Sequence, residues 1–360
     1  VGRAGGRAVS RQALLRAACL GTIADLVPLD GENRVIAALG LAALATARAP
    51  GLRALLAEAG LAPGVAPTAE EVAFRIAPRL NAAGRLDTAM LALSLFEERD
   101  ATRAEGVARE LTVRNAERQA LERRVVAEAR ARIGGAPDEV LLIEADASWH
   151  RGVLGIAASR LAREYHRPVL LFGRDGERVS GSGRSIPGVS LHGILKELSA
   201  HFIDFGGHDQ AVGGSLPAER FEAFREDARA LFRDRVRPET LVRRAEADAE
   251  LPLEAATPEL ARELALLEPH GSGNPRPVFL ARAVAAAAGF VPVGASGLRG
   301  RLRSPGGGLR AIAWQPDAGL SGLAASGRPF DVHYRLAEDR RGYGLQVEIV
   351  GSRAAEATPA

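Results

Sequence analysis

The sequence predicts a multidomain protein of the α/β plus β class, in which helices come first, an α/β domain follows and a small β-barrel comes last. Apolar residues recur at helical spacing in the first part of the chain. At Gly134 the pattern changes to short buried strands that alternate with helices, and after Arg237 it changes to short strands separated by glycine turns. We expect segments at 1–96, 97–133, 134–236 and 237–354, and a tail at 355–360.

Composition is that of a globular chain in a reducing compartment. The 360 residues are 47% hydrophobic and 25% charged, and no apolar stretch reaches the ~20 residues that a membrane span requires. Cys19 is the one cysteine, which excludes an intrachain disulfide and a cysteine-based zinc cluster. We therefore expect a soluble monomer in the cytoplasm. Because the chain begins at Val1 without a methionine, a preceding part has to be considered.

Nearly all the positive charge is arginine, since Lys196 is the one lysine. Guanidinium forks suit phosphate groups. The alternative is that the richness in arginine, alanine and glycine reflects only the nucleotide composition of the source genome.

The first helices are expected from Gln12 to Leu20 and from Val35 to about Arg48. Asp25 lies between them in the apolar run TIADLV. A carboxylate there must be solvated, capping, paired or bound to metal, because an isolated buried charge is too costly. The residues alone favour a helix cap or an ion pair over a metal ligand.

Another helix is expected from Ala69 to Leu80, followed by a polar interruption, RLNAAGR, and a helix that ends near Phe96. Arg79 and Arg85 flank the small residues of this interruption. Two such arginines could clamp a phosphate, and they could equally be solvated helix ends.

The segment 97–133 predicts one long amphipathic connector helix. Its apolar positions recur at multiples of three or four residues, namely Val107, Leu111, Leu121, Val125 and Ala129. Its many charges favour a solvated face over a binding site.

A β-α-β unit is expected next, with strands at 139–143 and 168–172 and a helix from about Gly152 to Tyr165. Glu144 and Asp146 follow the first strand at the spacing of metal-binding carboxylates. Acidic residues are also common where a turn enters a helix, and we favour that role.

The stretch 180–214 predicts a phosphate site. It begins with SGSGR, which we expect to be a glycine-rich turn, and glycine lets backbone amides approach an oxyanion closely. Ser182, Arg184, Ser185 and His208 add side-chain donors. The alternative is that the glycine pairs make tight turns and that His208 is a hydrogen-bonded structural residue.

The final part predicts a helix from about Pro258 to Leu267 among short strands, as in a small barrel or OB-fold. Acidic residues at 246, 248 and 250 favour a solvated strand edge over a metal ladder. A basic hairpin carries Arg299, Arg301, Arg303 and Arg310. It would suit a nucleic-acid backbone, although aromatic stacking partners are few.

Taken in order, these segments resemble the RecJ family of DHH phosphoesterases over nearly the whole chain. The matching motifs are GTIADLVPLDGENR, FRIAPRLNAAGRL, RNAERQALE, SWHRGVLGIAASRLAREYHRPVLLF, GSGRSIPG, FGGHDQAVGG and LEPHGSGNPRPVF. The resemblance implies a partial DHH phosphoesterase domain, a DHH-associated α/β domain and an OB-fold. One departure is His270, where an apolar aromatic residue is expected.

The resemblance also implies an activity, the 5′-to-3′ exonuclease digestion of single-stranded DNA with manganese or magnesium in DNA repair and recombination. It makes Asp25 a metal ligand, and it implies DNA-repair proteins as possible partners. The residues that would contact the DNA strand are Arg79, Arg85, Ser182, Arg184, Gly206, Gly207 and His208.

The upstream metal-binding aspartates and the DHH triplet of the family do not occur in this sequence. Two-metal phosphodiester cleavage requires several carboxylates and a histidine, so we expect this chain alone to be inactive. Two alternatives remain. One is a non-catalytic module that binds single strands, and the other is a DHH phosphoesterase acting on short oligonucleotides. The barrel counts against the second, because those smaller relatives lack one.

Overall fold

The computed structural model describes residues 3–4, 7–8, 10–86, 88–135, 138–294, 297–304, 307–317, 319–339 and 344–355. The chain divides into two units, and each is considered by itself. The first unit comprises Val1–Leu44, Ala66–Val72 and Arg244–Ala360, and the second comprises Ala45–Val65 and Ala73–Arg243. Among the described residues, no helix has the length and apolar character needed to cross a membrane.

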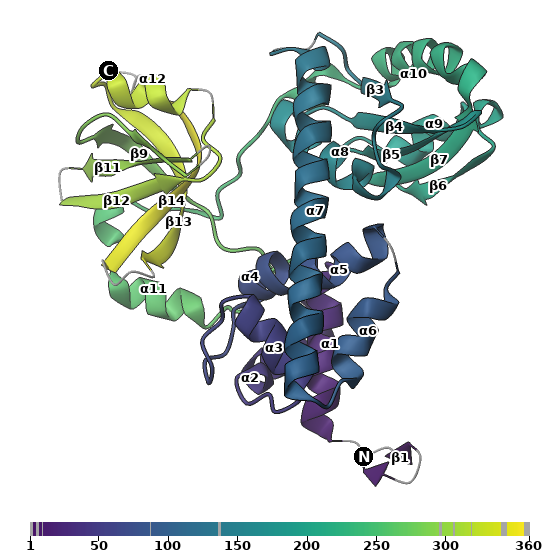
Figure 1. Ribbon diagram of the computed structural model, residues 1–360. Coiled ribbons are helices and arrows are strands. Elements are labelled where there is room, and N and C mark those ends of the chain that lie inside the picture. The colour runs from purple at the N-terminus through teal and green to yellow at the C-terminus, as the bar shows by residue number, and fades with distance from the viewer. Residues whose placement is uncertain are drawn as a thin grey trace. The chain divides into compact units, whose positions relative to one another are not determined.

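The helical part of the second unit is organised by the long helix α7. Its bounds and those of its neighbours are α3 Pro50–Glu58, α5 Ala77–Leu86, α6 Met90–Glu97 and α7 Ala101–Ile133. In Figure 1, α7 runs from these shorter helices to the α/β sheet. The helix starts at Ala101 because the Asp100 side chain accepts a hydrogen bond from the Arg103 N–H at 2.9 Å. The connector helix is confirmed, although Glu97 belongs to α6.

The polar interruption predicted at RLNAAGR is wrong. The segment is helical and forms most of α5, which follows a π-helix at Val72–Ile76. Arg79 bonds to neighbouring segments from within this helix, and these tertiary contacts compensate for its polar side chain. The break in the helix comes after Leu86, before α6 begins at Met90.

The α/β part of the second unit contains one mixed sheet with the strand order β3-β4-β5-β7-β6. The strands are β3 Leu142–Asp146, β4 Val169–Asp175, β5 Arg178–Arg184, β6 Asp204–His208 and β7 Ala211–Pro217. The helices are α8 Arg151–Tyr165, α9 Leu191–Lys196 and α10 Phe221–Arg235. Strands β3 and β4 are parallel and joined through α8, which confirms the predicted β-α-β unit.

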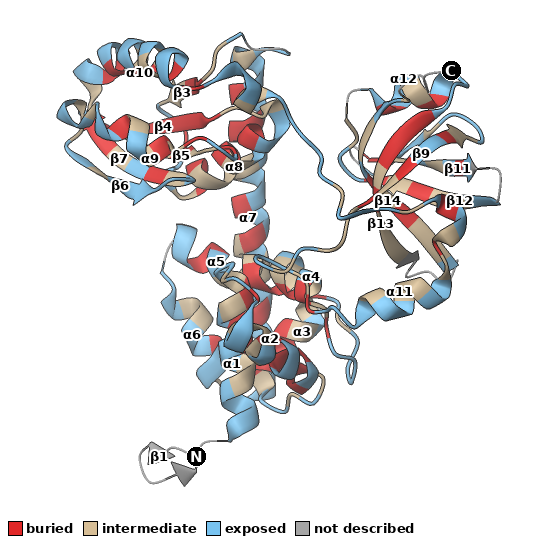
Figure 2. Ribbon diagram, turned by 180° about the vertical axis from the view of Figure 1, so that it is seen from behind, coloured by how far each residue is buried: buried red, intermediate tan, exposed pale blue. Residues whose placement is uncertain are grey.

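Each face of this sheet is covered by different helices. Leu170 and Phe172 pack in a cluster with residues of α9 and α10, whereas Val169 and Leu171 pack with residues of α7 and α8. Strand alternation divides neighbouring residues between the two faces in this way. In Figure 2, β4 is mainly buried and the edge strand β6 is mainly exposed. The exposed part of the sheet is therefore its β6 edge.

The prediction that SGSGR forms a glycine-rich turn is wrong, because these residues belong to strand β5. A Cβ on Gly181 would lie 2.3 Å from the Phe172 ring, and a Cβ on Gly183 would lie 2.4 Å from Leu170 Cδ2. Both glycines are therefore required by core packing under the sheet. Their role is steric, and they do not cradle an anion.

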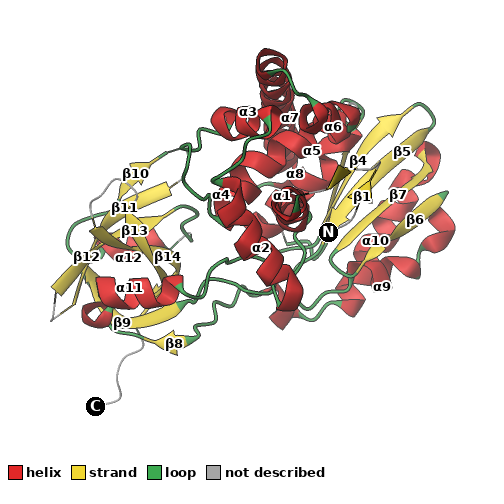
Figure 3. Ribbon diagram, turned by 90° about the horizontal axis from the view of Figure 1, so that it is seen from below, coloured by secondary structure: helices red, strands yellow, loops and turns green. Residues whose placement is uncertain are grey.

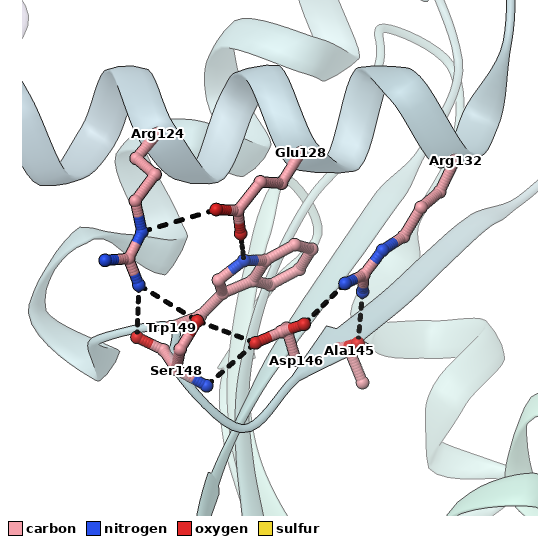
Figure 4. A network of polar contacts seen from close by, with 7 residues as sticks. All are labelled: Arg124, Glu128, Arg132, Ala145, Asp146, Ser148 and Trp149. Carbon is pink, nitrogen blue, oxygen red and sulfur yellow. Dashed lines mark hydrogen bonds and ion pairs between the residues drawn. The ribbon is translucent and has the colours of Figure 1, made fainter.

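A polar network joins α7 to the loop between β3 and α8 (Figure 4). The Trp149 indole N–H donates to Glu128 Oε2 at 2.7 Å, and the Arg132 guanidinium lies 5.1 Å from the Trp149 ring centroid. Asp146 accepts hydrogen bonds from Arg132 and from the N–H and hydroxyl of Ser148. Asp146 thus joins this loop to α7, and the predicted role at the start of the helix is wrong, because His150 is the N-cap of α8 and its first turn carries no acidic residue.

The first unit contains helices near the chain start and the predicted barrel. The helices are α1 Arg11–Ala24, α2 Gly31–Leu44, α4 Ala69–Glu71, α11 Pro258–Ala265 and α12 Leu320–Ala325. The strands are β1 Arg3–Ala4, β2 Arg7–Ala8, β8 Ala249–Glu250, β9 Phe279–Ala286, β10 Val291–Val293, β11 Gly297–Ser304, β12 Gly307–Ala313, β13 Phe330–Asp339 and β14 Gly344–Ala354. Figure 3 shows α11 and α12 beside strands β9, β13 and β14.

Strands β9 to β14 form a partly closed barrel. Their sheet has the order β10-β11-β12-β14-β13-β9-β8. In addition, β11 pairs with β9 from the other end of the sheet, and this pairing partly closes the barrel. Phe330, Val332 and Tyr334 are fully buried inside it. Of the acidic residues at 246, 248 and 250, the structure places only Glu250 in a strand, so the predicted strand face with three carboxylates is wrong.

We predict that Gly183→Ala destabilises the protein by about 1–3 kcal/mol, because the new methyl group overpacks the core between Leu170 and Val212. Gly106→Ala is the matched control. Gly106 lies inside α7 with open space around its Cβ position, and alanine there should stabilise by about 0.5–1 kcal/mol. Urea unfolding monitored by circular dichroism measures both. Equal stability of wild type and Gly183→Ala would contradict the packing account.

We also predict acid sensitivity at Asp146. Hydrogen bonds from Arg132 and then from Ser148 lower the pKa of Asp146 to about 2, against about 3.9 in an unfolded chain. The carboxylate therefore stabilises the fold above about pH 4, and this contribution is lost as the pH falls toward 2. Asp146→Asn should lower Tm by about 1–3 °C at pH 7 and by less near pH 2. Asp234→Asn, on an exposed side chain, is the control; a Tm difference that is the same at both pH values would refute the assignment.

Candidate nucleic-acid interface

Two of the predicted residues, Ser182 and Arg184, project from β5 toward α8. A Cβ on Gly155 of α8 would lie 2.9 Å from both Arg184 Nη2 and Ser182 Oγ, so glycine makes room for them. Arg184 Nη1 donates to Ser182 Oγ at 3.1 Å and to the Gly183 carbonyl at 2.7 Å. These bonds fix the guanidinium in place before any ligand binds.

Arg85 reaches the same region from the end of α5. A Cβ on Gly152 would lie 2.1 Å from the Arg85 carbonyl oxygen, so this glycine lets α5 pack against the first turn of α8. Burial lowers the pKa of Arg184, and the charge of Arg85 lowers it further. Partial burial lowers the pKa of Arg85 as well, and the charge of Arg118 lowers it further. These positively charged groups repel one another, and a bound anion would reduce that repulsion.

Helix α7 adds a buried ion pair that the sequence analysis missed. Arg118 is 8% exposed and donates to Glu122 Oε2 at 2.8 Å and to Asn115 Oδ1 at 3.1 Å. Arg160 Nη1 lies 3.9 Å from the other oxygen of Glu122. We refer to Arg85, Arg118, Arg160 and Arg184 as the arginine cluster. A sequence signal existed, because Arg118 lies seven residues from both Leu111 and Val125, on the apolar stripe of the helix.

Beside the arginine cluster, the sheet face is smooth and open. Ser182 pairs with Gly213, and Gly213 pairs with Gly206 in the next strand, so the three lie in one row. A Cβ on Gly206 would meet nothing within 4 Å, and one on Gly213 would meet only the Gly181 carbonyl at 3.8 Å. This row could seat an extended chain of sugar and phosphate groups without steric obstruction.

Gly207 and His208, the last two residues of β6, lie on opposite faces of the sheet. His208 is exposed and follows Gly206 on the open face, in the row that also holds Ala211 and Arg184. Gly207 alternates to the opposite face and has φ +144°. A Cβ there would lie 2.2 Å from the Ala211 carbonyl oxygen, so Gly207 allows close pairing of β6 and β7.

The Arg79 guanidinium makes hydrogen bonds within the helical part of the second unit. It donates to Thr112 Oγ1 at 3.1 Å, to the Glu58 carbonyl at 3.0 Å and to the Arg75 carbonyl. Desolvation by burial lowers its pKa. These contacts hold α5 against α7 and the end of α3, and thereby support Arg85 at the other end of α5.

Asp25 is an exposed residue at the C-terminal end of α1. Its backbone N–H donates to the Gly21 carbonyl at 3.0 Å, whereas its carboxylate makes no hydrogen bond or ion pair within the described residues. An accessible carboxylate fits one position in the shell of a hard divalent cation. No group of three His, Cys, Asp or Glu side chains that could hold a metal ion occurs in the described part of the chain. Asp25 would therefore need further ligands.

The barrel carries the predicted basic hairpin on its outer surface. Arg301 pairs with Arg310 across β11 and β12, and Arg299 precedes them on the same side. They line a cavity of about 990 Å³ together with Trp314, which is 52% exposed. The sequence analysis missed Trp314, an aromatic ring beside these cations. His270 lines the same cavity, and its Nδ1 atom is buried without a hydrogen-bond partner in the described residues.

Two family models match the chain. A model described as the DHHA1 domain matches residues 138–234, which contain Ser182, Arg184 and the row of small residues. A model described as the RecJ OB domain matches residues 247–349, which contain the barrel.

Curated relatives and a solved structure agree with these models. The chain is 37% identical over 270 residues to the single-stranded-DNA-specific exonuclease RecJ of Bacillus subtilis, covering 74% of this chain and 34% of that protein. For the Thermus thermophilus protein of the same name, identity is 40% over 266 residues, with 73% and 38% covered. The chain thus spans little more than a third of the length of these relatives.

The crystal structure of RecJ in complex with Mn²⁺ from Thermus thermophilus superposes with a TM-score of 0.82 at 34% identity. The match covers 96% of this chain and 50% of that one. A second structure of that protein, in complex with Mg²⁺, gives the same score. From the two domain models, the identities and this superposition, we conclude that the chain belongs to the RecJ family.

Proposed function

We propose that this chain is part of a metal-dependent exonuclease that digests single-stranded DNA from its 5′ end in DNA repair and recombination. The observation that carries the proposal is the arginine cluster beside the open row Ser182, Gly213 and Gly206. Relatives of similar sequence bear the name single-stranded-DNA-specific exonuclease, which supports the same substrate.

In this proposal the DNA backbone lies across the open sheet face. Arg184 and Arg85 contact phosphates, whose negative charge reduces the repulsion between the two guanidinium groups. Ser182 lines the strand-binding surface and accepts a hydrogen bond from Arg184. His208 donates a hydrogen bond to the strand, and Gly206 lets the strand lie close to the sheet. Gly207 acts indirectly by keeping β6 against β7, and Arg79 acts by supporting α5. Neither Arg184 nor His208 serves as a catalytic base.

Asp25 is proposed as one ligand of a catalytic Mn²⁺ or Mg²⁺ ion. The solved RecJ structures that superpose on this chain contain these two metals, and carboxylate oxygen suits both. When bound, such an ion activates water and stabilises the charge on the phosphate. The described residues supply the strand-binding surface and Asp25, and other ligands complete the site.

A second candidate function is a single-strand-binding module without catalysis. It is supported by one observation, the arginine cluster beside the open row, which would hold phosphates whether or not a metal site is present. For either function we propose a monomer in the cytoplasm, with DNA-repair proteins as possible partners. Sedimentation velocity tests the monomer.

We predict that Arg184→Ala weakens binding of a single-stranded oligonucleotide by about 10-fold or more, since a charge-assisted hydrogen bond contributes about 1.5–3 kcal/mol. The dependence of log K on log salt should become shallower by about 0.7, which corresponds to one lost phosphate contact. Fluorescence anisotropy measures both quantities. Arg233→Ala, on α10 across the sheet, removes the same charge and serves as the control. If the two variants bind equally well, Arg184 is not in the interface.

We predict that Asp25→Asn in the full-length protein abolishes most manganese-dependent cleavage but leaves strand affinity within about twofold. A 5′-labelled single strand and its duplex form are incubated with Mn²⁺ and resolved on a denaturing gel. Asp30→Asn, an exposed neighbour, is the control. Wild-type protein that binds the strand without cutting it supports the binding module, and absence of binding contradicts both functions.

A further inference from the structure

The loop that enters the barrel, residues 268–274, folds onto the segment that follows Asp25. The Leu29 N–H donates to the Ser272 carbonyl at 2.6 Å, and the Leu29 side chain is only 3% exposed. Two segments separated by more than two hundred residues of sequence thus meet at the turn after α1. We call residues 268–274 the entry loop.

The close approach depends on two glycines of the entry loop. A Cβ on Gly271 would lie 2.7 Å from Leu29 Cδ1, and one on Gly273 would lie 3.0 Å from Pro28 Cβ. Gly273 also has φ +73°, which side chains rarely adopt. Any larger residue at Gly271 must therefore push the entry loop away from Leu29 or displace Leu29 itself.

The entry loop is itself well braced. The Asn274 side-chain amide donates to the Leu267 and Pro269 carbonyls, each at 2.9 Å, and Gly271 and Asn274 exchange backbone hydrogen bonds. Arg34 of α2 donates to the Leu267 carbonyl at 2.7 Å. A loop restrained by these hydrogen bonds can in turn restrain Pro28 and Leu29, against which it packs.

The turn that contains Asp25 has a backbone conformation that needs such support. Leu26 has φ +56°, which is rare for leucine and costs about 1–2 kcal/mol. The Val27 N–H donates to the Thr22 carbonyl at 3.1 Å, which ties the near side of the turn to α1. The entry loop holds the far side at Leu29. Strained conformations persist where the surroundings constrain them from both sides.

We propose that the entry loop is a positioning element for the Asp25 carboxylate, so that a loop of the barrel domain, through its contact with Leu29, sets the geometry of the proposed metal site. This inference rests on the proposed function, in which Asp25 is a metal ligand. A ligand displaced by a fraction of an ångström coordinates poorly, and residues that only orient ligands typically change metal affinity by about 10–100-fold. Strand affinity should not change, because the residues proposed to bind the strand are not part of the entry loop.

The test compares Gly271→Ala with Gly322→Ala in the full-length protein. Gly322 lies in α12 with nothing within 4 Å of its Cβ position, so it is the matched control. Mn²⁺ binding is measured by electron paramagnetic resonance without DNA, cleavage is measured as a function of Mn²⁺, and strand affinity is measured by anisotropy. Gly271→Ala should weaken Mn²⁺ binding about 10-fold, with cleavage restored at high Mn²⁺ and strand affinity unchanged. Gly322→Ala should match wild type.

A second variant covers the case in which Gly271→Ala unfolds. Asn274→Ala removes the side-chain bonds that brace the entry loop without adding bulk, and it should weaken Mn²⁺ binding about threefold while hydrogen exchange at 26–29 accelerates. Wild-type Mn²⁺ affinity in a folded variant overturns this inference alone, provided that the wild-type protein cuts DNA. A wild-type protein that binds no Mn²⁺ overturns the proposed function, and this inference with it.

Discussion

The arrangement of the second unit depends on one electrostatic constraint, the cost of holding several guanidinium groups around a single carboxylate. Glu122 pairs with Arg118 and lies near Arg160, and Arg118 in turn lowers the pKa of Arg85. Removing one member of a buried pair costs about 3–5 kcal/mol, so the pair must be kept. The excess positive charge that remains is unfavourable for the free protein. In the proposed interface, a bound phosphate chain would relieve the repulsion among these guanidinium groups.

Glycine has opposite uses on the two faces of the same sheet. Gly181 and Gly183 face the core, where Phe172 and Leu170 occupy the space of a side chain. Gly206 and Gly213 face outward, where the space is empty. The sequence alone cannot distinguish these uses, because all four lie in similar glycine-rich stretches. The two uses are distinguished only when the residues are assigned to strands, in which side chains alternate between the two faces. SGSGR was predicted as a turn because its sequence does not reveal that it is a strand.

Features that depend on local pattern could be predicted, and features that depend on distant contacts could not. The spacing of Leu111, Val125 and Ala129 was sufficient for α7, and the apolar strands flanking α8 were sufficient for the β-α-β unit. By contrast, RLNAAGR stays helical through bonds from Arg79 to α3 and α7. The resemblance to the RecJ family grouped Arg85 with Arg184, whereas their contacts with Gly152 and Gly155 of α8 required the structure.

The geometry of the arginine cluster also explains how the proposed interface would bind single strands of any sequence. Arg184 is fixed by the Gly183 carbonyl and by Ser182, so little side-chain entropy remains to be lost on binding. Its neighbours in the row are glycines, which offer no side chain to read a base edge. Recognition therefore falls on the backbone phosphates, which every sequence shares. In the proposed exonuclease, each advance by one nucleotide would present the same set of phosphate contacts to Arg184 and Arg85.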